Sequence, residues 1–193
     1  MSGTRLLLAS TSPARRALMD ALGVPYQAEA PGVDEQVPPG TPVEQATAML
    51  ARRKAEAVAR ANPDALVLGA DQLVELDGDA LGKPPDEASA LRQLQALSGR
   101  SHRIVTGVCL LGPAAGVDLR EVDVVVMTLF PLPEEELRRY VATGEWRGCA
   151  GGYRVEGRGQ ALFQDIQGDR TSVQGLPMLR VVRMLRRAGA PLL

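Results

Sequence analysis

The chain has 193 residues, of which 45% are hydrophobic and 23% charged, and its formal net charge is −1. This length suits one domain with a sizeable core. A net charge near zero excludes a strong electrostatic field that would attract nucleic acid or an anionic membrane. The longest apolar runs are too short and too polar to span a bilayer. The N-terminal residues lack the core and cleavage site of a signal peptide, which favours a cytoplasmic protein.

The first part of the chain predicts two helices and two extended segments. Leu6–Ala9 is a short apolar run and predicts a buried strand. Ser12–Leu22 predicts a helix that begins at a Ser-Pro pair, with the serine as N-cap, and that ends at Gly23. Tyr26–Ala30 is expected to be extended, and Thr41–Ala61 predicts a long helix opened by a Thr-x-x-Glu capping box.

The middle of the chain predicts a strand, a hairpin and a helix. Leu66–Ala70 is a strongly apolar run and predicts a buried strand that ends at Asp71. An Asp-Gly pair at the centre of Leu73–Leu81 is a strong hairpin signal. A helix is expected over Asp86–Leu97, followed by a turn over Ser98–His102.

The last part of the chain alternates strands and helices. Strands are expected over Ile104–Leu111, Val122–Leu129 and Leu162–Ile166, and helices over Glu134–Thr143 and Met178–Ala188. No repeat, low-complexity tract or linker interrupts the chain. The order of elements therefore predicts a single α/β domain over residues 1–193, with a mixed sheet.

The stretch ASTSPARR, at the first strand-to-helix junction, is a candidate anion site. Ser10, Thr11 and Ser12 offer hydroxyl groups beside the free backbone N–H groups of the helix start. Arg15 and Arg16 fall in the first turn, where the helix dipole makes cations mildly unfavourable and a bound anion would offset that cost. The many donors suit phosphate. The same residues also fit a plain helix cap with solvated arginines, and neither P-loop nor dinucleotide spacing is present.

Acids and lysines elsewhere could complete such a site. Asp71 follows a buried strand, where open α/β sheets bind ligands, although an acid there can also simply start a turn. Asp34 and Glu35 lie in another loop, and a second acid is what hydrated Mg²⁺ needs beside phosphate ligands. Only two of the 22 basic residues are lysines, Lys54 and Lys83, and a lysine supplies a compact point charge. Lys54 lies in mid-helix after two arginines, where a solvated face is the simpler interpretation.

Several motifs together resemble a known family. The segments LASTSPARRALMDALG, VDE, GADQ, LGKP, LSGRSHRIVTGV and AGGYRVEGRGQALF occur in the order and spacing of the Maf-like nucleoside triphosphate pyrophosphatases, from about Leu6 to Pro177. The resemblance implies an inosine-triphosphatase-like α/β fold, with an elongated mixed sheet, flanking helices and two lobes around a cleft. It implies hydrolysis of a nucleoside triphosphate between the α and β phosphates with a divalent cation, Mg²⁺ or Mn²⁺, and it suggests a homodimer.

Carried over by position, the resemblance implies a role for each charged residue of the candidate site. Asp71 matches the catalytic acid that activates the attacking water, directly or through metal. Glu35 matches a second acid, which holds the metal together with Asp71. The residues that would grip the triphosphate are Ser10, Arg15, Lys54 and Lys83.

Three further positions bear on the base. Gln72 and Glu156 match the branch of the family that acts on 7-methyl-GTP, whereas the branches that act on dTTP and UTP typically carry Thr and Gln there. A carboxylate accepts two parallel N–H groups from a guanine edge and favours the cationic 7-methylguanine. Ala14 departs from this match, because the 7-methyl-GTP branch can carry a bulky aromatic residue there. We expect 7-methyl-GTP as the substrate, with dTTP or UTP as the alternative.

Two other classes of function were weighed. A non-catalytic, nucleotide-binding regulator of cell division is the alternative to an enzyme, but such a protein would be free to lose the acids and bases that this chain has. The near-zero charge, 3% aromatic content and missing glycine fingerprint argue against a nucleic-acid or dinucleotide binder. The lone His102 is expected to be a hydrogen-bonded turn residue, and Cys109 and Cys149 to be small buried residues without a disulfide.

Overall fold

The computed structural model describes residues 5–192 and contains a seven-stranded mixed sheet flanked by helices, which confirms the expected mixed α/β class. The strand order is β2-β1-β3-β5-β6-β7, and β4 pairs with β3 beside this path. β1 pairs in parallel with β2 and β3, and the remaining pairs are antiparallel. The strands are β1 (Leu6–Leu8), β2 (Gln27–Ala28), β3 (Leu66–Leu76), β4 (Asp79–Leu81), β5 (Ser101–Gly112), β6 (Val117–Leu129) and β7 (Phe163–Gln167).

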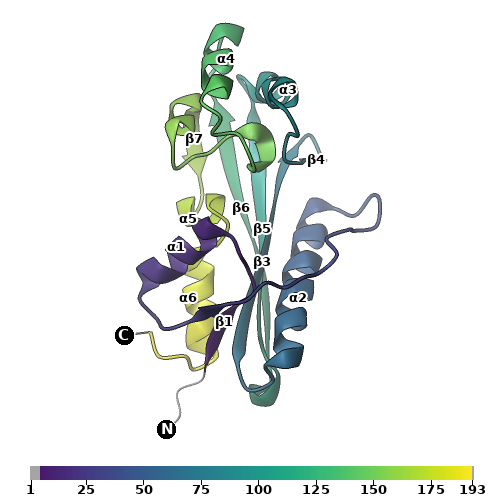
Figure 1. Ribbon diagram of the computed structural model, residues 1–193, viewed down its shortest axis with the longest axis vertical. Coiled ribbons are helices and arrows are strands. Elements are labelled where there is room, and N and C mark those ends of the chain that lie inside the picture. The colour runs from purple at the N-terminus through teal and green to yellow at the C-terminus, as the bar shows by residue number, and fades with distance from the viewer. Residues whose placement is uncertain (1–4, 193) are drawn as a thin grey trace.

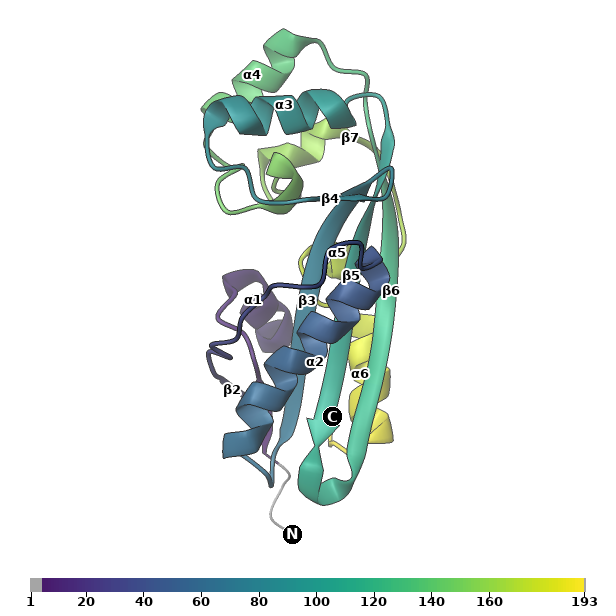
Figure 2. The ribbon, with the colours of Figure 1, turned by 90° about the vertical axis from the view of Figure 1, so that its right-hand side faces the viewer.

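Three long strands give the molecule its elongated shape. β3, β5 and β6 are 11 to 13 residues long and run through both ends of the molecule (Figure 1). One end, the lower lobe, holds β1 and β2, and the other end, the upper lobe, holds β4 and β7 (Figure 2). The expected two-lobed, elongated arrangement is therefore observed.

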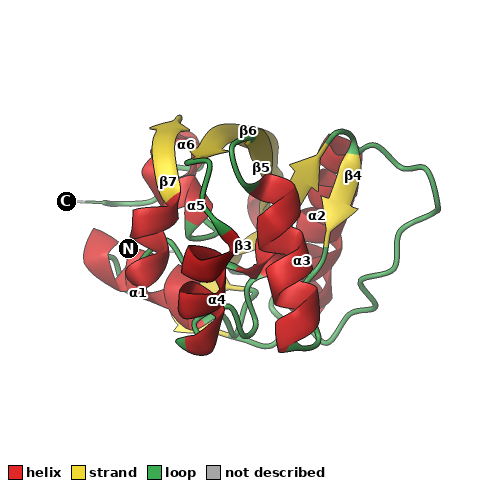
Figure 3. Cartoon of the chain, turned by 90° about the horizontal axis from the view of Figure 1, so that it is seen from above, coloured by secondary structure: helices red, strands yellow, loops and turns green. Residues whose placement is uncertain are grey.

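The helices cover both faces of the sheet. In the lower lobe α2 packs on one face, whereas α1 and α6 lie on the other (Figure 3). The α-helices are α1 (Pro13–Leu22), α2 (Val43–Ala61), α3 (Glu87–Leu97), α4 (Glu134–Ala142), α5 (Arg170–Val173) and α6 (Met178–Arg187). Short 3₁₀ turns are η1 (Pro113–Ala115), η2 (Ala150–Gly152) and η3 (Arg158–Leu162). None of the helices within residues 5–192 combines the length and hydropathy of a membrane span.

The buried apolar side chains form three clusters that follow this layering. One lies between α2 and the sheet, and includes Ala51 and Val67. A second lies beneath α1 and α6 on the opposite face, and includes Met19. The third fills the upper lobe around Trp146 and Tyr153. Each lobe thus has its own core, and the long strands join them.

Local signals in the sequence are confirmed at several turns and caps. Ser12 caps α1, with Pro13 in its first turn, and Gly23 ends the helix in the left-handed conformation with φ of 75°. Asp77 and Gly78 both have positive φ between β3 and β4, as the hairpin signal predicts.

Several local predictions were wrong. β3 does not end at Asp71, because Asp71 pairs with Gly107 of β5 and the ladder continues to Leu76. The capping box is not formed, since the Thr41 hydroxyl donates to the Pro38 carbonyl and α2 begins after Pro42. β6 begins at Val117 rather than Val122, extended by its ladder with β5. His102 is not a turn residue, as the next subsection describes.

Candidate active site

A cleft of about 590 Å³ opens between the two lobes. The lower lobe contributes the junction of β1 and α1, the loop before α2, and Leu50 and Lys54 of α2. The upper lobe contributes the loop after β4 and the segment around η2. Every residue that the sequence singled out as a site residue lines this cleft, namely Ser10, Ala14, Arg15, Glu35, Lys54, Asp71, Gln72, Lys83 and Glu156. Segments far apart in the sequence therefore converge on one concave surface.

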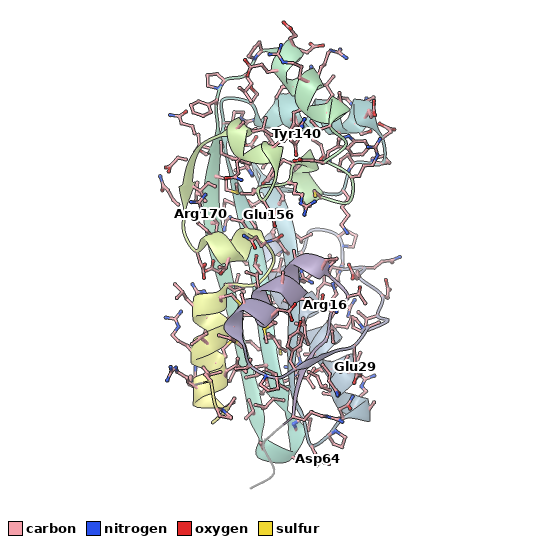
Figure 4. The ribbon with its side chains drawn as sticks, turned by 60° about the vertical axis from the view of Figure 1, so that its left-hand side comes forward. Arg16, Glu29, Asp64, Tyr140, Glu156 and Arg170 are labelled. Atoms are coloured by element: carbon pink, nitrogen blue, oxygen red, sulfur yellow. The ribbon has the colours of Figure 1, made fainter. Side chains whose placement is uncertain are left out.

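The start of α1 directs donors toward the cleft. The Ser12 hydroxyl accepts from the Arg15 backbone N–H at 3.5 Å, and the Ser10 hydroxyl accepts from the Ser12 N–H at 3.1 Å. The Arg15 guanidinium donates through Nη1 to Ser10 Oγ at 3.4 Å and through Nε to the Gly175 carbonyl at 3.0 Å. Arg15 therefore belongs to the cleft wall, whereas Arg16 is exposed on the lower side of α1 (Figure 4).

Burial and two neighbouring carboxylates act on Arg15 in opposite directions. Burial lowers the pKa of Arg15, and the negative charges of Asp71 and Glu35 oppose that shift. A partly buried guanidinium whose remaining N–H groups face a cleft is well suited to hold phosphate oxygens. The interpretation of ASTSPARR as a plain cap with solvated arginines is thus wrong for Arg15 and fits Arg16.

An acid–lysine–acid cluster lies at the centre of the cleft. Lys54 Nζ is 2.5 Å from Asp71 Oδ1 and 2.8 Å from Glu35 Oε1. The side chains of Lys54 and Asp71 are each only 8% exposed, whereas that of Glu35 is 61% exposed. Lys54 therefore does not lie on a solvated helix face. Burial raises the pKa of the Asp71 carboxyl, and the hydrogen bond and charge of Lys54 work against that rise.

Two glycines let α2 approach the sheet closely enough to form this cluster. A Cβ added at Gly69 would lie 2.3 Å from the Ala51 carbonyl oxygen, and one added at Gly107 would lie 2.5 Å from the Thr47 carbonyl. Gly107 is the β5 partner of Asp71. The absence of a side chain there brings the backbone of α2 against the sheet, so that Lys54 reaches the middle of β3.

The loop that carries Glu35 is held by the same helix. Arg53 donates through Nη1 to the Asp34 carbonyl at 2.6 Å and to the Gln36 carbonyl at 2.9 Å. Asp34 itself is exposed, accepts from the Gln36 backbone N–H at 3.0 Å and does not line the cleft. Consecutive residues of α2, Arg53 and Lys54, therefore fix the loop and the acid pair.

The specificity candidates lie around the cleft in different environments. The Gln72 amide donates to Thr106 Oγ1 at 3.0 Å and to the Ser172 carbonyl, so it holds α5 against the sheet. Glu156 belongs to the upper lobe, has a side chain 31% exposed, and lies 4.0 Å from Arg154 (Figure 4). Lys83 is exposed in the loop after β4. Glu156 and Lys83 thus stand across the cleft from α1 and its donors.

His102 belongs to a buried polar pair rather than a turn. It lies in β5, is 2% exposed, and its Nε2 is 2.6 Å from the Tyr153 hydroxyl. Tyr153 also packs edge-on against Phe163, with ring centroids 4.9 Å apart, and it lines the cleft. The expectation of a hydrogen-bonded histidine is confirmed, but its place in a turn is wrong. Burial lowers the pKa of His102 to about 4, so it is neutral near pH 7.

The cysteines behave differently from each other. Cys109 is buried beneath α2, and burial raises its pKa to about 12. Cys149 is only partly buried and lines the cleft. The expectation that both are unbridged is confirmed, whereas the expected full burial holds for Cys109 alone.

Asp71 and Glu35 are the cleft residues that could contribute ligands to a divalent cation. Lys54 contacts Oδ1 of Asp71 and Oε1 of Glu35, so each carboxylate has a second oxygen to offer. Within residues 5–192 no group of three or more His, Cys, Asp and Glu side chains is placed to bind a metal. Mg²⁺ commonly binds through one or two carboxylates, with water and substrate phosphates as further ligands, and the two acids suit that mode.

These features define an α/β protein with a cleft built around an acid–lysine–acid cluster and lined by Arg15 and Lys83. Residues 5–188 match the family described as "Maf-like protein", and the chain belongs to that family. The resemblance seen in the motifs is thereby confirmed.

Relatives with two different names match nearly the whole chain. A "dTTP/UTP pyrophosphatase" of Symbiobacterium thermophilum is 42% identical over 97% of this chain and 96% of its own length. A "7-methyl-GTP pyrophosphatase" of Xanthomonas campestris pv. campestris is also 42% identical, over 96% of both chains. Among solved structures, the Staphylococcus aureus Ham1 protein covers 66% of this chain and 73% of its own at 18% identity, with a TM-score of 0.47.

Proposed function

We propose that this chain is a nucleoside triphosphate pyrophosphatase, which hydrolyses the bond between the α and β phosphates and releases nucleoside monophosphate and pyrophosphate. The observation that carries the proposal is the buried Lys54–Asp71 pair, with 2.5 Å between its charged atoms, in a cleft that also presents Ser10 and Arg15. A buried carboxylate beside several phosphate-binding cations is the constellation that water attack on phosphorus requires. The relatives named as pyrophosphatases support the same reaction.

In the proposed mechanism the chain positions water and neutralises phosphate charge. Asp71, whose pKa is raised by burial, accepts a proton from the attacking water. Arg15, Ser10 and Lys83 bind the triphosphate oxygens, and their charges and dipoles stabilise the leaving pyrophosphate. Asp71 and Glu35 would hold Mg²⁺ or Mn²⁺, which supplies Lewis-acid stabilisation of the phosphates and orients the water when it is bound.

For the base, Glu156 supports 7-methyl-GTP. Its carboxylate lines the cleft and can accept from the two N–H groups of a guanine edge, and its negative charge favours a cationic base. Uracil and thymine offer one N–H between two carbonyl groups. A carboxylate has no N–H to donate to those carbonyl groups, so they would stay unpaired. The second candidate is dTTP or UTP, which the name of the Symbiobacterium relative favours at the same 42% identity.

The proposal is tested by pyrophosphate release from a panel of triphosphates. Purified protein with Mg²⁺ or Mn²⁺ is assayed on 7-methyl-GTP, GTP, UTP, dTTP and CTP. We expect release with at least one substrate, fastest with 7-methyl-GTP, and a loss of about a hundredfold or more in Asp71→Asn. Asp123→Asn is the matched control, because Asp123 is also buried and paired, with Arg180 at 2.7 Å, but lies outside the cleft. Nucleotide binding without any turnover would support the regulator instead.

A further inference from the structure

The described structure pairs Lys54 with both acids at once. Its ammonium lies within 2.8 Å of one oxygen of Glu35 and one oxygen of Asp71. The side chains of Lys54 and Asp71 are each 8% exposed, so solvent screens that pair little. A single positive charge therefore occupies the space between the two carboxylates that the proposed function assigns to a divalent cation.

Electrostatics sets the lysine and the divalent cation against each other. Any cation shared by Asp71 and Glu35 would lie within a few ångströms of the Lys54 ammonium, where like charges repel strongly in a poorly screened site. The two acids carry two negative charges, which the positive charges of Lys54 and Arg15 formally balance. A divalent cation entering alone would create an excess of positive charge in the cleft.

A triphosphate removes this conflict. Its oxygens bring negative charge to the same cleft and give Lys54 a second set of partners close to the acid pair. Glu35 is 61% exposed and sits on a loop, so it can change partner without uncovering a core, whereas Asp71 is fixed in β3. The geometry thus has one exposed acid, one acid fixed in the sheet and a lysine that can turn from the acids to phosphate.

We propose that Lys54 is an internal counter-cation that occupies the metal position of the nucleotide-free protein, so that the divalent cation and the triphosphate bind together. This inference rests on the proposed function and deepens it. The triphosphate pairs with Lys54, and the divalent cation then binds the carboxylates that Lys54 no longer contacts. Binding of the cation and of the nucleotide is therefore strongly and reciprocally coupled.

The test measures Mn²⁺ binding directly, by the electron paramagnetic resonance signal of free Mn²⁺, in protein without nucleotide. Wild type is compared with Lys54→Met and Lys54→Gln, the second of which keeps an N–H donor for Asp71. We expect both variants to bind Mn²⁺ about tenfold tighter than wild type or more, because the competing charge is gone. Arg52→Met is the matched control, since Arg52 lies on the same helix but pairs with Glu56 and Asp118 outside the cleft. Its Mn²⁺ affinity and activity should equal those of wild type.

A second arm adds a non-hydrolysable nucleotide with a methylene group between the α and β phosphorus atoms. This analogue should tighten binding of Mn²⁺ to the wild-type protein by more than it does in the two Lys54 variants. The inference is overturned if, without nucleotide, both variants bind Mn²⁺ no more tightly than wild type does. It is also overturned if wild type binds Mn²⁺ tightly without nucleotide and the analogue leaves that affinity unchanged. Pyrophosphate release by wild type is scored separately: release combined with either of those results refutes the counter-cation role alone, whereas no release from any triphosphate refutes the proposed function.

Discussion

Replacing Gly107 by alanine tests whether close packing of α2 builds the site. The new Cβ would lie 2.5 Å from the Thr47 carbonyl, whereas ordinary contacts begin near 3.4 Å, so α2 has to withdraw by roughly 0.9 Å. Overpacking of this kind costs about 1–3 kcal/mol of unfolding free energy. The same shift stretches the 2.5 Å contact between Lys54 and Asp71, and a misplacement near 1 Å can lower kcat by up to about a hundredfold.

The assay combines urea denaturation with pyrophosphate release by the folded enzyme. Gly112→Ala is the control, because its Cβ would lie 2.7 Å from Leu66 Cδ2 at the far end of β5, away from the cleft. That variant should keep the wild-type kcat and lose less stability than Gly107→Ala, because the atom that its Cβ meets is the end of a leucine side chain rather than backbone. Gly107→Ala should lose both. Wild-type stability and kcat in Gly107→Ala would refute the claim that this glycine sets the approach of α2.

Two further predictions concern the upper lobe. Burial lowers the pKa of His102 from 6.5 to about 4, so the unfolded chain takes up a proton that the folded chain resists. His102 should therefore lower the free energy of unfolding by up to about 3 kcal/mol as the pH falls from about 6.5 to about 4. In urea titrations, the variant His102→Gln should lack this part of the pH dependence. If the unfolding free energies of wild type and His102→Gln depended on pH identically, this prediction would be contradicted. Glu156→Gln should shift the ratio of kcat/KM for UTP and dTTP to that for 7-methyl-GTP upward by about tenfold or more, with unchanged stability, and an unchanged ratio would remove Glu156 from base recognition.

The positions of the site residues along the chain could be predicted, because each belongs to a motif with a local physical reason. The Ser-Pro helix start, Glu35 in its loop and the rare lysines all mark residues that line the cleft. Apolar periodicity also located most strands and helices. These patterns describe only local sequence. They predicted that the strand ends at Asp71, whereas its ladder with β5 continues past that residue.

The contacts of Lys54 depend on tertiary structure that no local pattern contains. The sequence did contain one signal that Lys54 is buried. Lys54 shares the helical spacing of a buried face with Leu50, Ala51, Ala55 and Val58. Two arginines directly before Lys54 favoured a solvated interpretation instead. Gly107 in an apolar strand was a second available signal, since a glycine there marks close approach of another backbone. The pairing of His102 with Tyr153, 51 residues away, had no signal in the sequence.

The position of water attack tests the central claim most directly. The protein is allowed to hydrolyse 7-methyl-GTP, UTP and dTTP in water enriched in oxygen-18, and the products are weighed by mass spectrometry. Attack at the α phosphorus, where Asp71 is proposed to direct water, places the heavy oxygen in the nucleoside monophosphate and leaves the pyrophosphate unlabelled. Label in the pyrophosphate, or release of orthophosphate with a nucleoside diphosphate, would contradict the proposed reaction.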